Sequence, residues 1–362
     1  MMLEKLKEYI HSLAQDKRIG ALESFLKAIL LFLSFFYFFG ILLTRFVHNL
    51  KIIAPKKAAC KVISIGNITL GGTGKTPFVI MLAKHLIRRG HKVAVLIRGY
   101  RRKSGNLQCQ SENADTMGDE GYLLSKELGL PVLVGADRIR NMQEAVNKYN
   151  ADVVILDDGF QHWKLKRDLD IVLVNALNPF GNERLIPRGV LREPVSSLKR
   201  ADVVVITKSN LLGSYGALGL QIKAVSRNSL LINSEHRPIN FMDLESAVFE
   251  LSFVQGKEVC LLSAIADPFS FEKMVLDLGA KIKLKFEFED HHRWSGKDMD
   301  KITGQCLKNG LNLIITTEKD AVKMSRFDRS LNLQILILKI EVEIKEKKDE
   351  FFSLIDRALK QA

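Results

Sequence analysis

Short apolar runs and amphipathic stretches alternate along most of the chain, and this alternation predicts strands followed by helices. Runs rich in β-branched residues predict strands at Lys61–Ile65, Lys92–Ile97, Val132–Val134, Asp152–Leu156, Ile171–Val174 and Val203–Ile206. Helical spacing of the apolar residues predicts helices at Pro77–Arg89, Asp119–Leu128 and Asp137–Tyr149. Because each helix falls between two strands, the pattern is typical of a doubly wound, mostly parallel sheet with helices on both faces.

A second series of elements begins beyond about Leu230, after the polar and turn-like stretch Asn233–Pro238. Strands are expected at Val259–Ser263, Lys281–Phe288, Leu313–Thr316 and Leu333–Ile340, with helices at Pro268–Leu278 and Lys297–Lys308. The strand from Lys281 alternates strictly, which predicts one solvated face. The chain is long enough for two domains. We therefore expect α/β domains at 51–235 and 236–344, the second being smaller, and a last helix within 345–362 that packs back on the first.

A segment of different character precedes these two series. No charged residue occurs from Ala28 to Thr44, and Lys27 and Arg45 bound this apolar run. Its length is near the lower limit for crossing a bilayer, where ~20 apolar residues are usual, so a spanning helix and a helix that lies in the interface both remain open. A cleaved secretory signal is disfavoured because the run starts late and no small-residue cleavage site follows it. We expect residues 1–50 to form a membrane-associated helical segment.

The glycine-rich stretch Gly66–Pro77, with the sequence G-N-I-T-L-G-G-T-G-K-T-P, lies between the first predicted strand and helix. Its glycines permit a tight turn whose N–H groups form an anion nest, and the helix N-terminus adds a partial positive charge. Lys75 can reach the β- and γ-phosphates of a nucleotide, and Thr76 supplies a hydroxyl for Mg²⁺. The stretch departs from G-x-x-x-x-G-K-[ST] only at Thr69, where glycine is usual, so it predicts a variant phosphate-binding loop (P-loop).

Two carboxylates, Asp157 and Asp158, end an apolar strand in the stretch Val153–His162. A carboxylate at the carboxyl end of a strand, beside a phosphate loop, is where Mg²⁺ is held directly or through water. Either acid could be the ligand. A weaker signal, Thr207 and Lys208 after another strand, resembles the base-binding element of P-loop GTPases, but Asn210 stands where an acid is usual and argues against guanine. A strand-terminal turn is an equally good explanation of that signal, and of a similar one at Thr317–Asp320.

Three polar clusters contain the groups that phosphoryl transfer requires: Met117–Glu120, Ile186–Pro194 and Glu289–Arg293. The reaction needs an aligned acceptor hydroxyl, a group that accepts its proton, and cations on the γ-phosphate. Asp119 could accept the proton, although the position also suits a simple N-cap. Adjacent histidines on a strand point apart, so one histidine acting with a carboxylate is a better hypothesis than two metal ligands.

The net charge and the cysteines limit which binding partners and which cellular compartment fit the chain. The 362 residues carry a formal net charge of +13, which favours an anionic partner: nucleic acid, nucleotide or an acidic membrane surface. The four cysteines lack C-x-x-C spacing, so the sequence indicates neither a disulfide framework nor a zinc site, and a reducing compartment fits.

Taken together, several motifs resemble those of the bacterial tetraacyldisaccharide 4′-kinases of lipid A biosynthesis. They are the glycine-rich loop, with Thr69 included, R-G-Y at 98–100, G-D-E at 118–120, D-D-G-F-Q-H at 157–162, R-G-V-L-R-E-P at 188–194 and D-H-H at 290–292. The resemblance runs from the apolar segment into the second domain. It implies two α/β/α domains with ATP in the cleft between them. It also implies an inner-membrane kinase that uses Mg²⁺ and ATP to phosphorylate the 4′-hydroxyl of an acylated glucosamine disaccharide 1-phosphate.

The resemblance also implies roles for individual residues. Asp119 would be the general base, assisted by His291 or His292, with His291 preferred, and Lys75 and Arg192 would act on the reacting groups. The nucleotide would be held by Thr69, Gly71, Gly72, Thr73, Gly74, Lys75, Thr76 and Pro77, together with Thr207 and Lys208. Mg²⁺ would be held by Thr76, Asp157, Asp158 and Glu120. The lipid substrate would contact Asn67, Tyr100, His162 and Glu193.

The predicted partners are therefore a lipid substrate and a membrane surface. An enzyme whose substrate stays in the bilayer must dock there, and the apolar segment and cationic body provide docking at about 1 kcal/mol per basic residue near anionic lipid. The positive charge then needs no nucleic acid. Because ATP is cytosolic, the catalytic domains should face the cytoplasm. The alternative hypotheses are a membrane-bound P-loop switch ATPase, which would carry a lysine where Leu70 stands, and a non-catalytic nucleotide-binding adaptor.

Overall fold

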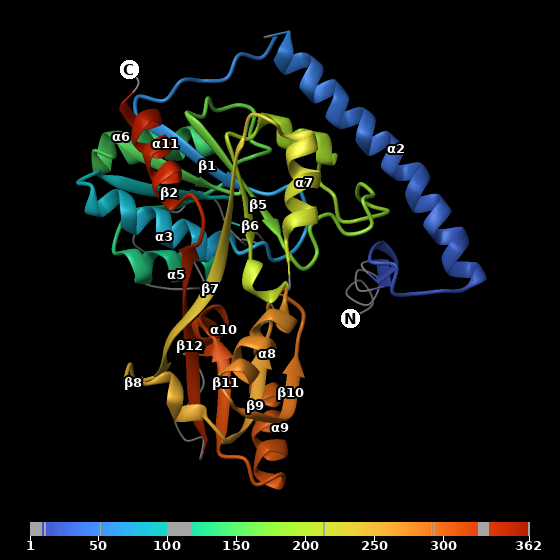
Figure 1. The fold of residues 1–362 in the computed structure, drawn as a ribbon, viewed down its shortest axis with the longest axis vertical. Coiled ribbons are helices and arrows are strands. Elements are labelled where there is room, and N and C mark those ends of the chain that lie inside the picture. The colour runs from blue at the N-terminus through green and yellow to red at the C-terminus, as the bar shows by residue number, and fades with distance from the viewer. Residues whose placement is uncertain are drawn as a thin grey trace.

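The computed structural model describes residues 9–10, 12–50, 52–99, 117–212, 214–290, 292, 294–324 and 333–360. A long helix, α2 (Ala21–Asn49), stands beside a body built on one twisted sheet, and the body is elongated, with the second half of the chain at its far end (Figure 1). The strands are β1 (Lys61–Gly66), β2 (Val93–Ile97), β3 (Val132–Val134), β4 (Val153–Asp157), β5 (Leu169–Asn175), β6 (Val203–Thr207), β7 (Leu230–Asp243), β8 (Val248–Phe249), β9 (Glu258–Ser263), β10 (Lys281–Glu287), β11 (Leu313–Thr317) and β12 (Gln334–Ile344).

The sheet is mostly parallel, as the alternation of strands and helices predicted. Its order is β10-β9-β11-β12-β7-β6-β5-β1-β4-β2-β3, with β8 beside β7. Every neighbouring pair from β7 to β3 is parallel, and so are the pairs among β9, β10, β11 and β12. The two parallel sets are joined by the antiparallel pair of β7 and β12. Parallel strands place their carboxyl ends at one edge, where βα loops gather the polar groups of a site.

Helices cover both faces of the sheet because the strands are apolar on both sides. The helices of the body are α3 (Lys75–Arg88), α5 (Asp119–Leu128), α6 (Arg138–Tyr149), α7 (Gly216–Val225), α8 (Pro268–Asp277), α9 (Gly296–Lys308), α10 (Glu318–Met324) and α11 (Lys348–Lys360), with 3₁₀ turns at Val195–Arg200, Ser209–Leu211 and Leu251–Val254. On one face α3, α5 and α11 share a core in which Phe78 meets Phe351 edge to face, at 6.1 Å between ring centroids. On the other face α6 and α7 pack in separate clusters.

The stretch Asn233–Pro238 is not a turn, as its polar composition suggested, but the middle of the long strand β7. It is extended because β12 pairs with it antiparallel, from Ser234 opposite Ile344 to Asp243 opposite Leu336. This two-stranded ribbon carries the chain from the first half to the second (Figure 1). The division at residue 235 therefore falls inside a strand, and the domain limits stay a prediction.

The second half is a smaller parallel set flanked by α8 on one face and α9 on the other. β10 forms the edge of the sheet, and its side chains alternate between exposed and half-buried, as its sequence predicted. Helices α7 and α10 were not foreseen. α10 is short, and its first residues belong to the Thr317–Asp320 stretch that the sequence offered only as a turn.

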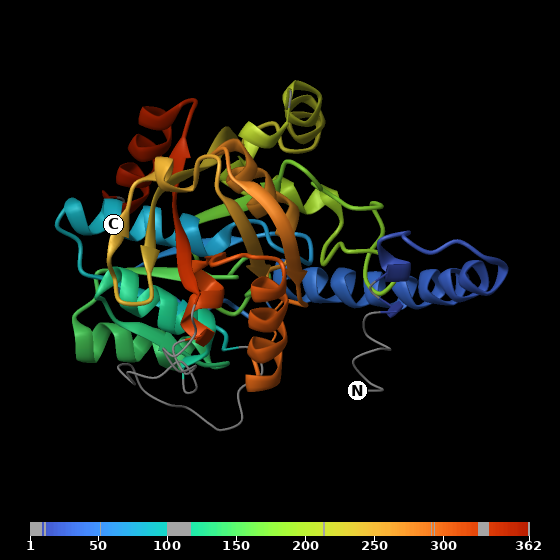
Figure 2. The same ribbon diagram turned by 90° about the horizontal axis from the view of Figure 1, so that it is seen from below.

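Helix α2 includes the apolar run but begins before it and ends after it. It is long and apolar enough to cross a membrane, and 6% of its most apolar window is buried. It projects to one side when the molecule is seen from below (Figure 2). Many of its large apolar side chains are exposed, among them Leu31, Leu33, Phe35 and Leu42. Eight others recur at helical spacing along one stripe: Leu22, Phe25, Ile29, Phe32, Phe36, Phe39, Leu43 and Phe46.

Candidate active site

The glycine-rich stretch forms a turn between β1 and α3, as its sequence predicted. Gly71 and Gly74 have φ angles of 111° and 78°, which a side chain would strain, and Gly74 is the N-cap of α3. Lys75 and Thr76 open the helix. A Cβ on Gly71 would meet nothing within 4 Å, so its side of the turn is open. This geometry has the features of an anion nest at a helix N-terminus.

Buried side chains hold the turn from beneath. Thr207 Oγ1 donates to Thr73 O at 3.0 Å, and Lys208 Nζ lies 3.4 Å from Gly72 O. Lys208 is also paired with Asp267, the N-cap of α8 in the second half. Burial lowers the pKa of Lys208, and the Asp267 carboxylate opposes that shift. The structure thus places Thr207 and Lys208 against the backbone of the turn, and a contact with the nucleotide base stays a prediction for them.

Asp157 ends β4 beside the turn and Asp158 follows it, but the two acids have different surroundings. Asp158 accepts from Arg192 Nη1 at 2.6 Å and lies 3.6 Å from Lys75 Nζ. Burial alone would raise the pKa of Asp158, but Lys75 and Arg192 outweigh it and lower that pKa to about 2. Asp157 is buried, its Oδ1 has no hydrogen-bond partner among the described residues, and burial together with the Glu120 charge raises its pKa.

Two buried polar atoms without a hydrogen-bond partner in the described part of the chain indicate whether the loop fits a metal-bound nucleotide. Besides Asp157 Oδ1, the buried Thr73 Oγ1 within the turn has no partner among the described residues. Buried polar atoms are rarely left unpaired in folded proteins, so both atoms indicate that a ligand completes the site. A hydroxyl in an anion nest suits a phosphate, and a carboxylate oxygen opposite Lys75 and Thr76 suits Mg²⁺. The residues present therefore fit both groups.

A cleft of about 220 Å³ opens between this turn and the second half of the chain. Its walls are the turn from Gly71 to Pro77, the start of α8, and the residues around Thr317 and Lys319 at the start of α10; Glu120, Asp157, His236 and Asp290 also line it. A wider groove of about 610 Å³ shares Thr76 and Pro77 with the cleft and runs along α3 and β12.

Acid–lysine contacts close the far side of the cleft. Lys319 Nζ, on α10, lies 3.3 Å from Glu120 and 3.0 Å from Asp290. Lys323 Nζ, one turn later, lies 3.6 Å from Asp119 Oδ2. Asp119 and Glu120 form the first turn of α5, where the N-terminal end of the helix dipole favours carboxylates. The G-D-E motif and the residues after β11 thus meet in space although they are distant in the sequence.

His292 lies apart from these contacts. Its ring stacks on Phe288 at 4.5 Å between centroids, and its Nε2 is 3.3 Å from Asp298 Oδ2. His291 and Tyr100 lie outside the described residues. His162 is half-buried, and burial, with the nearby Arg138 and Arg167 charges, lowers its pKa to about 4.

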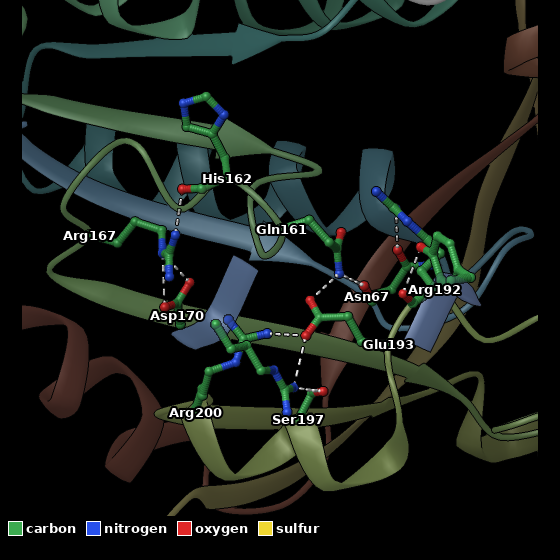
Figure 3. Close-up of polar contacts among 11 residues, drawn as sticks. Asn67, Gln161, His162, Arg167, Asp170, Arg192, Glu193, Ser197 and Arg200 are labelled. Atoms are coloured by element: carbon green, nitrogen blue, oxygen red, sulfur yellow. Dashed lines mark hydrogen bonds and ion pairs between the residues drawn. The ribbon is translucent and has the colours of Figure 1, made fainter. Parts of the chain in front are cut away.

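The remaining substrate candidates form one polar network beside β1 (Figure 3). Asn67 is buried: its Nδ2 donates to Thr69 O at 2.8 Å, and its Oδ1 accepts from Arg192 Nη1 at 3.2 Å. Glu193 is 3% exposed and accepts from Gln161 Nε2 at 3.0 Å. The network therefore connects the R-E-P run to the P-loop. It brings Asn67 and Glu193, expected at the lipid substrate, next to Arg192, expected at the reacting groups, and these roles stay predictions.

Sequence reasoning passed over several residues of this region: Arg45, Arg138, Gln161, Arg200, His236, Asp267, Lys319 and Lys323. Gln161 and Lys319 stood inside motifs already singled out, so their spacing was a usable signal. Arg138 Nη1 donates to the carbonyl oxygens of Leu96 and Asp157 at the ends of two strands, and no local pattern marks such a contact.

Comparison with known proteins agrees with this geometry. Residues 26–360 match the family model described as tetraacyldisaccharide-1-P 4′-kinase. The chain is 35% identical to the tetraacyldisaccharide 4′-kinase of Halothermothrix orenii, over 95% of this chain and 96% of that protein. It is 36% identical to the enzyme of Syntrophus aciditrophicus, over 87% of this chain and 88% of that protein.

A crystal structure supports the same assignment. LpxK from Aquifex aeolicus, in its "apo" form in complex with ATP, matches 92% of this chain and 99% of its own chain, with a TM-score of 0.73 and 28% identity. The P-loop, the mostly parallel sheet and the long apolar helix are therefore those of a known fold. The chain belongs to the tetraacyldisaccharide 4′-kinase family, whose activity is the ATP-dependent phosphorylation of a lipid in lipid A biosynthesis.

Proposed function

We propose that this chain transfers the γ-phosphate of Mg²⁺-bound ATP to the 4′-hydroxyl of a tetraacyldisaccharide 1-phosphate at the surface of the inner membrane. One observation carries the proposal. Arg192 binds Asp158 beside the P-loop, while its carbonyl oxygen accepts a hydrogen bond from Tyr37, on the apolar helix α2, at 2.9 Å. A phosphate-binding site that is hydrogen-bonded to an apolar helix suits a lipid substrate that stays in a bilayer.

The nucleotide would lie in the cleft, with its phosphates in the turn Gly71–Gly74. Thr76 and Asp157 would hold Mg²⁺, with Glu120 and Asp158 nearby, because Asp157 Oδ1 lacks a partner while Asp158 is paired with Lys75 and Arg192. When bound, Mg²⁺ neutralises charge on the phosphates. Lys75 would then exchange its contact with Asp158 for the γ-phosphate.

Asp119 would accept the proton of the acceptor hydroxyl. As that proton leaves, the hydroxyl oxygen bonds to the γ-phosphorus, and the bond to the β–γ bridging oxygen breaks, which releases ADP with the electron pair. Lys323 holds the Asp119 carboxylate in place at 3.6 Å. Because His292 is paired with Asp298 and stacked on Phe288, the assisting histidine is better assigned to His291.

Helix α2 would lie in the membrane interface instead of crossing the bilayer. Ser34, near its middle, is buried and contacts Leu185 O and Arg188 N of the body, at 2.9 and 3.0 Å. A helix that spanned the bilayer in this position would place the irregular backbone around Leu185 and Arg188 at membrane depth, and lipid-exposed irregular loops do not occur in the hydrocarbon region. The opposite, apolar stripe would face the lipid, and the catalytic half would lie on the cytoplasmic side, where ATP is.

Transfer of labelled γ-phosphate tests the proposal directly. Full-length protein in mixed micelles, given Mg²⁺, ATP and tetraacyldisaccharide 1-phosphate, should yield a bisphosphorylated lipid, and chelation of Mg²⁺ by EDTA should stop the transfer. An unchanged lipid in the presence of a correctly folded, ATP-binding protein would contradict the proposal. Hydrolysis of ATP at the same rate without acceptor would favour a switch ATPase.

A further inference from the structure

Arg45, near the end of α2, reaches into the body and contacts a buried carboxylate. Its Nη2 lies 3.1 Å from Glu193 Oε2, and the same nitrogen donates to Ser197 Oγ. The two partners of the ion pair stand 148 positions apart in the chain. Because Glu193 is 3% exposed, its charge is not solvated by water and depends on its partners.

Glu193 has two other partners, which belong to the body itself. Arg200 Nη2 lies 2.5 Å from Oε2, and Gln161 Nε2 donates to Oε1 at 3.0 Å (Figure 3). The Arg200 guanidinium lies over the rings of Phe160 and Trp163, each 4.1 Å from the ring centroid. Without Arg45 the carboxylate would therefore keep a paired cation, so the fold of this region does not depend on α2 alone.

Arg192, the residue before Glu193, connects Glu193 to the P-loop and to Asp158. Arg192 N donates to Ile68 O at 2.7 Å, which sets the R-E-P run beside the strand that enters the P-loop. Its side chain contacts Asp158 and Asn67, and its carbonyl oxygen accepts from Tyr37. Helix α2 thus contacts two successive residues of the body: Tyr37 donates a hydrogen bond to the carbonyl oxygen of Arg192, and Arg45 pairs with Glu193.

We infer that Arg45 is a positioning residue for phosphoryl transfer. The inference rests on the proposed function. Arg45 fixes Glu193, Glu193 fixes the backbone at Arg192, and Arg192 holds Asp158 next to Lys75. The position of Arg192, and of the Asp158 carboxylate from which Lys75 moves to the γ-phosphate, then depends on the docking of the membrane helix. A displacement of about 1 Å at a reacting group is enough to lower a rate substantially, up to about 10²-fold. A planar guanidinium suits this role because it binds Glu193 and Ser197 with one fixed group.

The test uses full-length protein in mixed micelles with saturating ATP and lipid acceptor, so that recruitment to a membrane does not limit the rate. Arg45→Ala should lower kcat about 10-fold, with the KM for ATP and the melting temperature close to wild type. Arg45→Lys should recover most of the loss, because it restores a positive charge beside the Glu193 carboxylate. Tyr37→Phe, which removes only the hydroxyl that binds Arg192 O, should lower kcat about 3-fold.

Arg184→Ala is the matched control. It removes one exposed positive charge from the loop that carries Arg192 and Glu193, and it should leave kcat unchanged. If Arg45→Ala keeps the wild-type kcat in micelles and loses only its binding to anionic vesicles, Arg45 is a headgroup contact and the inference is wrong. If Arg45→Ala fails to fold, Arg45→Gln, which removes the charge and keeps most of the side-chain length, takes its place, and a wild-type kcat in that variant would also overturn the inference. Failure of the wild-type protein to phosphorylate the lipid would instead refute the proposed function.

Discussion

The cleft and the contact between α2 and the body are two polar regions on either side of the P-loop, and they are built differently. At the cleft, the groups proposed to act on the phosphates and the metal come from short motifs: Lys75 and Thr76 follow the glycines, and Asp157 and Asp158 stand at the end of one strand. At the α2 contact, Arg45 and Glu193 stand 148 positions apart. The chemistry is therefore encoded locally, whereas the support that orients it is assembled from distant parts of the chain.

This difference predicts three kinds of variant. Changes in the cleft should reduce transfer in every medium, because they remove groups that act on the reacting atoms. Changes on the exposed apolar stripe of α2 should reduce activity only where the enzyme first has to bind a membrane. Changes to residues that connect the two halves of the body should have effects on activity that lie between these extremes.

The largest effect is expected from Lys75→Ala. The γ-phosphate would lose its main cation, and Asp158 would keep only Arg192, so kcat should fall by about 10³-fold or more. Labelled phosphate transfer in micelles measures the loss. Lys84→Ala, on the exposed face of the same helix, is the matched control and should stay near wild type. A near-normal rate in Lys75→Ala would refute the assignment of the loop.

Asp119→Asn should have the next largest effect. If the carboxylate accepts the hydroxyl proton, the amide should lower kcat by about 10²-fold and leave the KM for ATP little changed. Steady-state kinetics at varied ATP separates these parameters. A change confined to KM would assign Asp119 to binding, and the general base would have to be sought among the acids that line the cleft, Glu120, Asp157 and Asp290.

Much of the cleft could be predicted from the sequence, since its motifs follow strands directly. The strand that leads to the loop, the loop itself and the acids after β4 form a local pattern, and parallel strands bring such ends to one edge. The extended conformation of Asn233–Pro238 could not be predicted in this way. Its polar sequence is typical of a turn, and only pairing with β12, about a hundred residues later, makes it a strand.

The contact between α2 and the body could not be predicted from the sequence either, although the sequence contains a weak signal for it. Ser34, Tyr37 and Arg45 are spaced so that they share one stripe of a mostly apolar helix, opposite the stripe that carries Phe32, Phe36 and Phe39. That stripe indicates a face that meets protein. It does not indicate the partner, because Leu185, Arg192 and Glu193 belong to a loop whose path depends on the whole sheet.

An intermediate effect is expected from Asp267→Asn, which leaves Lys208 buried without its partner beneath the P-loop. Breaking a buried ion pair costs about 3 kcal/mol or more, so the free energy of unfolding should fall by that order, and the KM for ATP should rise about 10-fold. Denaturant unfolding measures the first quantity. Glu272→Gln, in an exposed pair with Lys285 on the same half of the chain, should cost about 1 kcal/mol or less.

The pH dependence sharpens this prediction. Burial alone would raise the pKa of Asp267, but Lys208 outweighs it and lowers that pKa below the 3.8 of an ordinary aspartate. A carboxylate whose pKa is depressed by folding contributes stability above its unfolded pKa and loses it as the pH falls through the folded value. The stability difference between wild type and Asp267→Asn should therefore be full at neutral pH and shrink below about pH 4. A difference that stayed constant to pH 3 would show that Asp267 acts through packing.

The smallest effect on the chemical step is expected from Phe36→Ser, on the exposed stripe of α2. The side chain is 59% exposed in the free protein, and its transfer into the interface should stabilise binding by about 1 kcal/mol, so vesicle affinity should fall about 5-fold. Phe269→Ser, equally exposed at 58% but on the second half of the chain, is the control and should leave vesicle binding unchanged. In saturated micelles both variants should keep the wild-type kcat. A loss of kcat in Phe36→Ser under those conditions would mean that the stripe meets protein or substrate, and the contrast between the two regions would no longer hold.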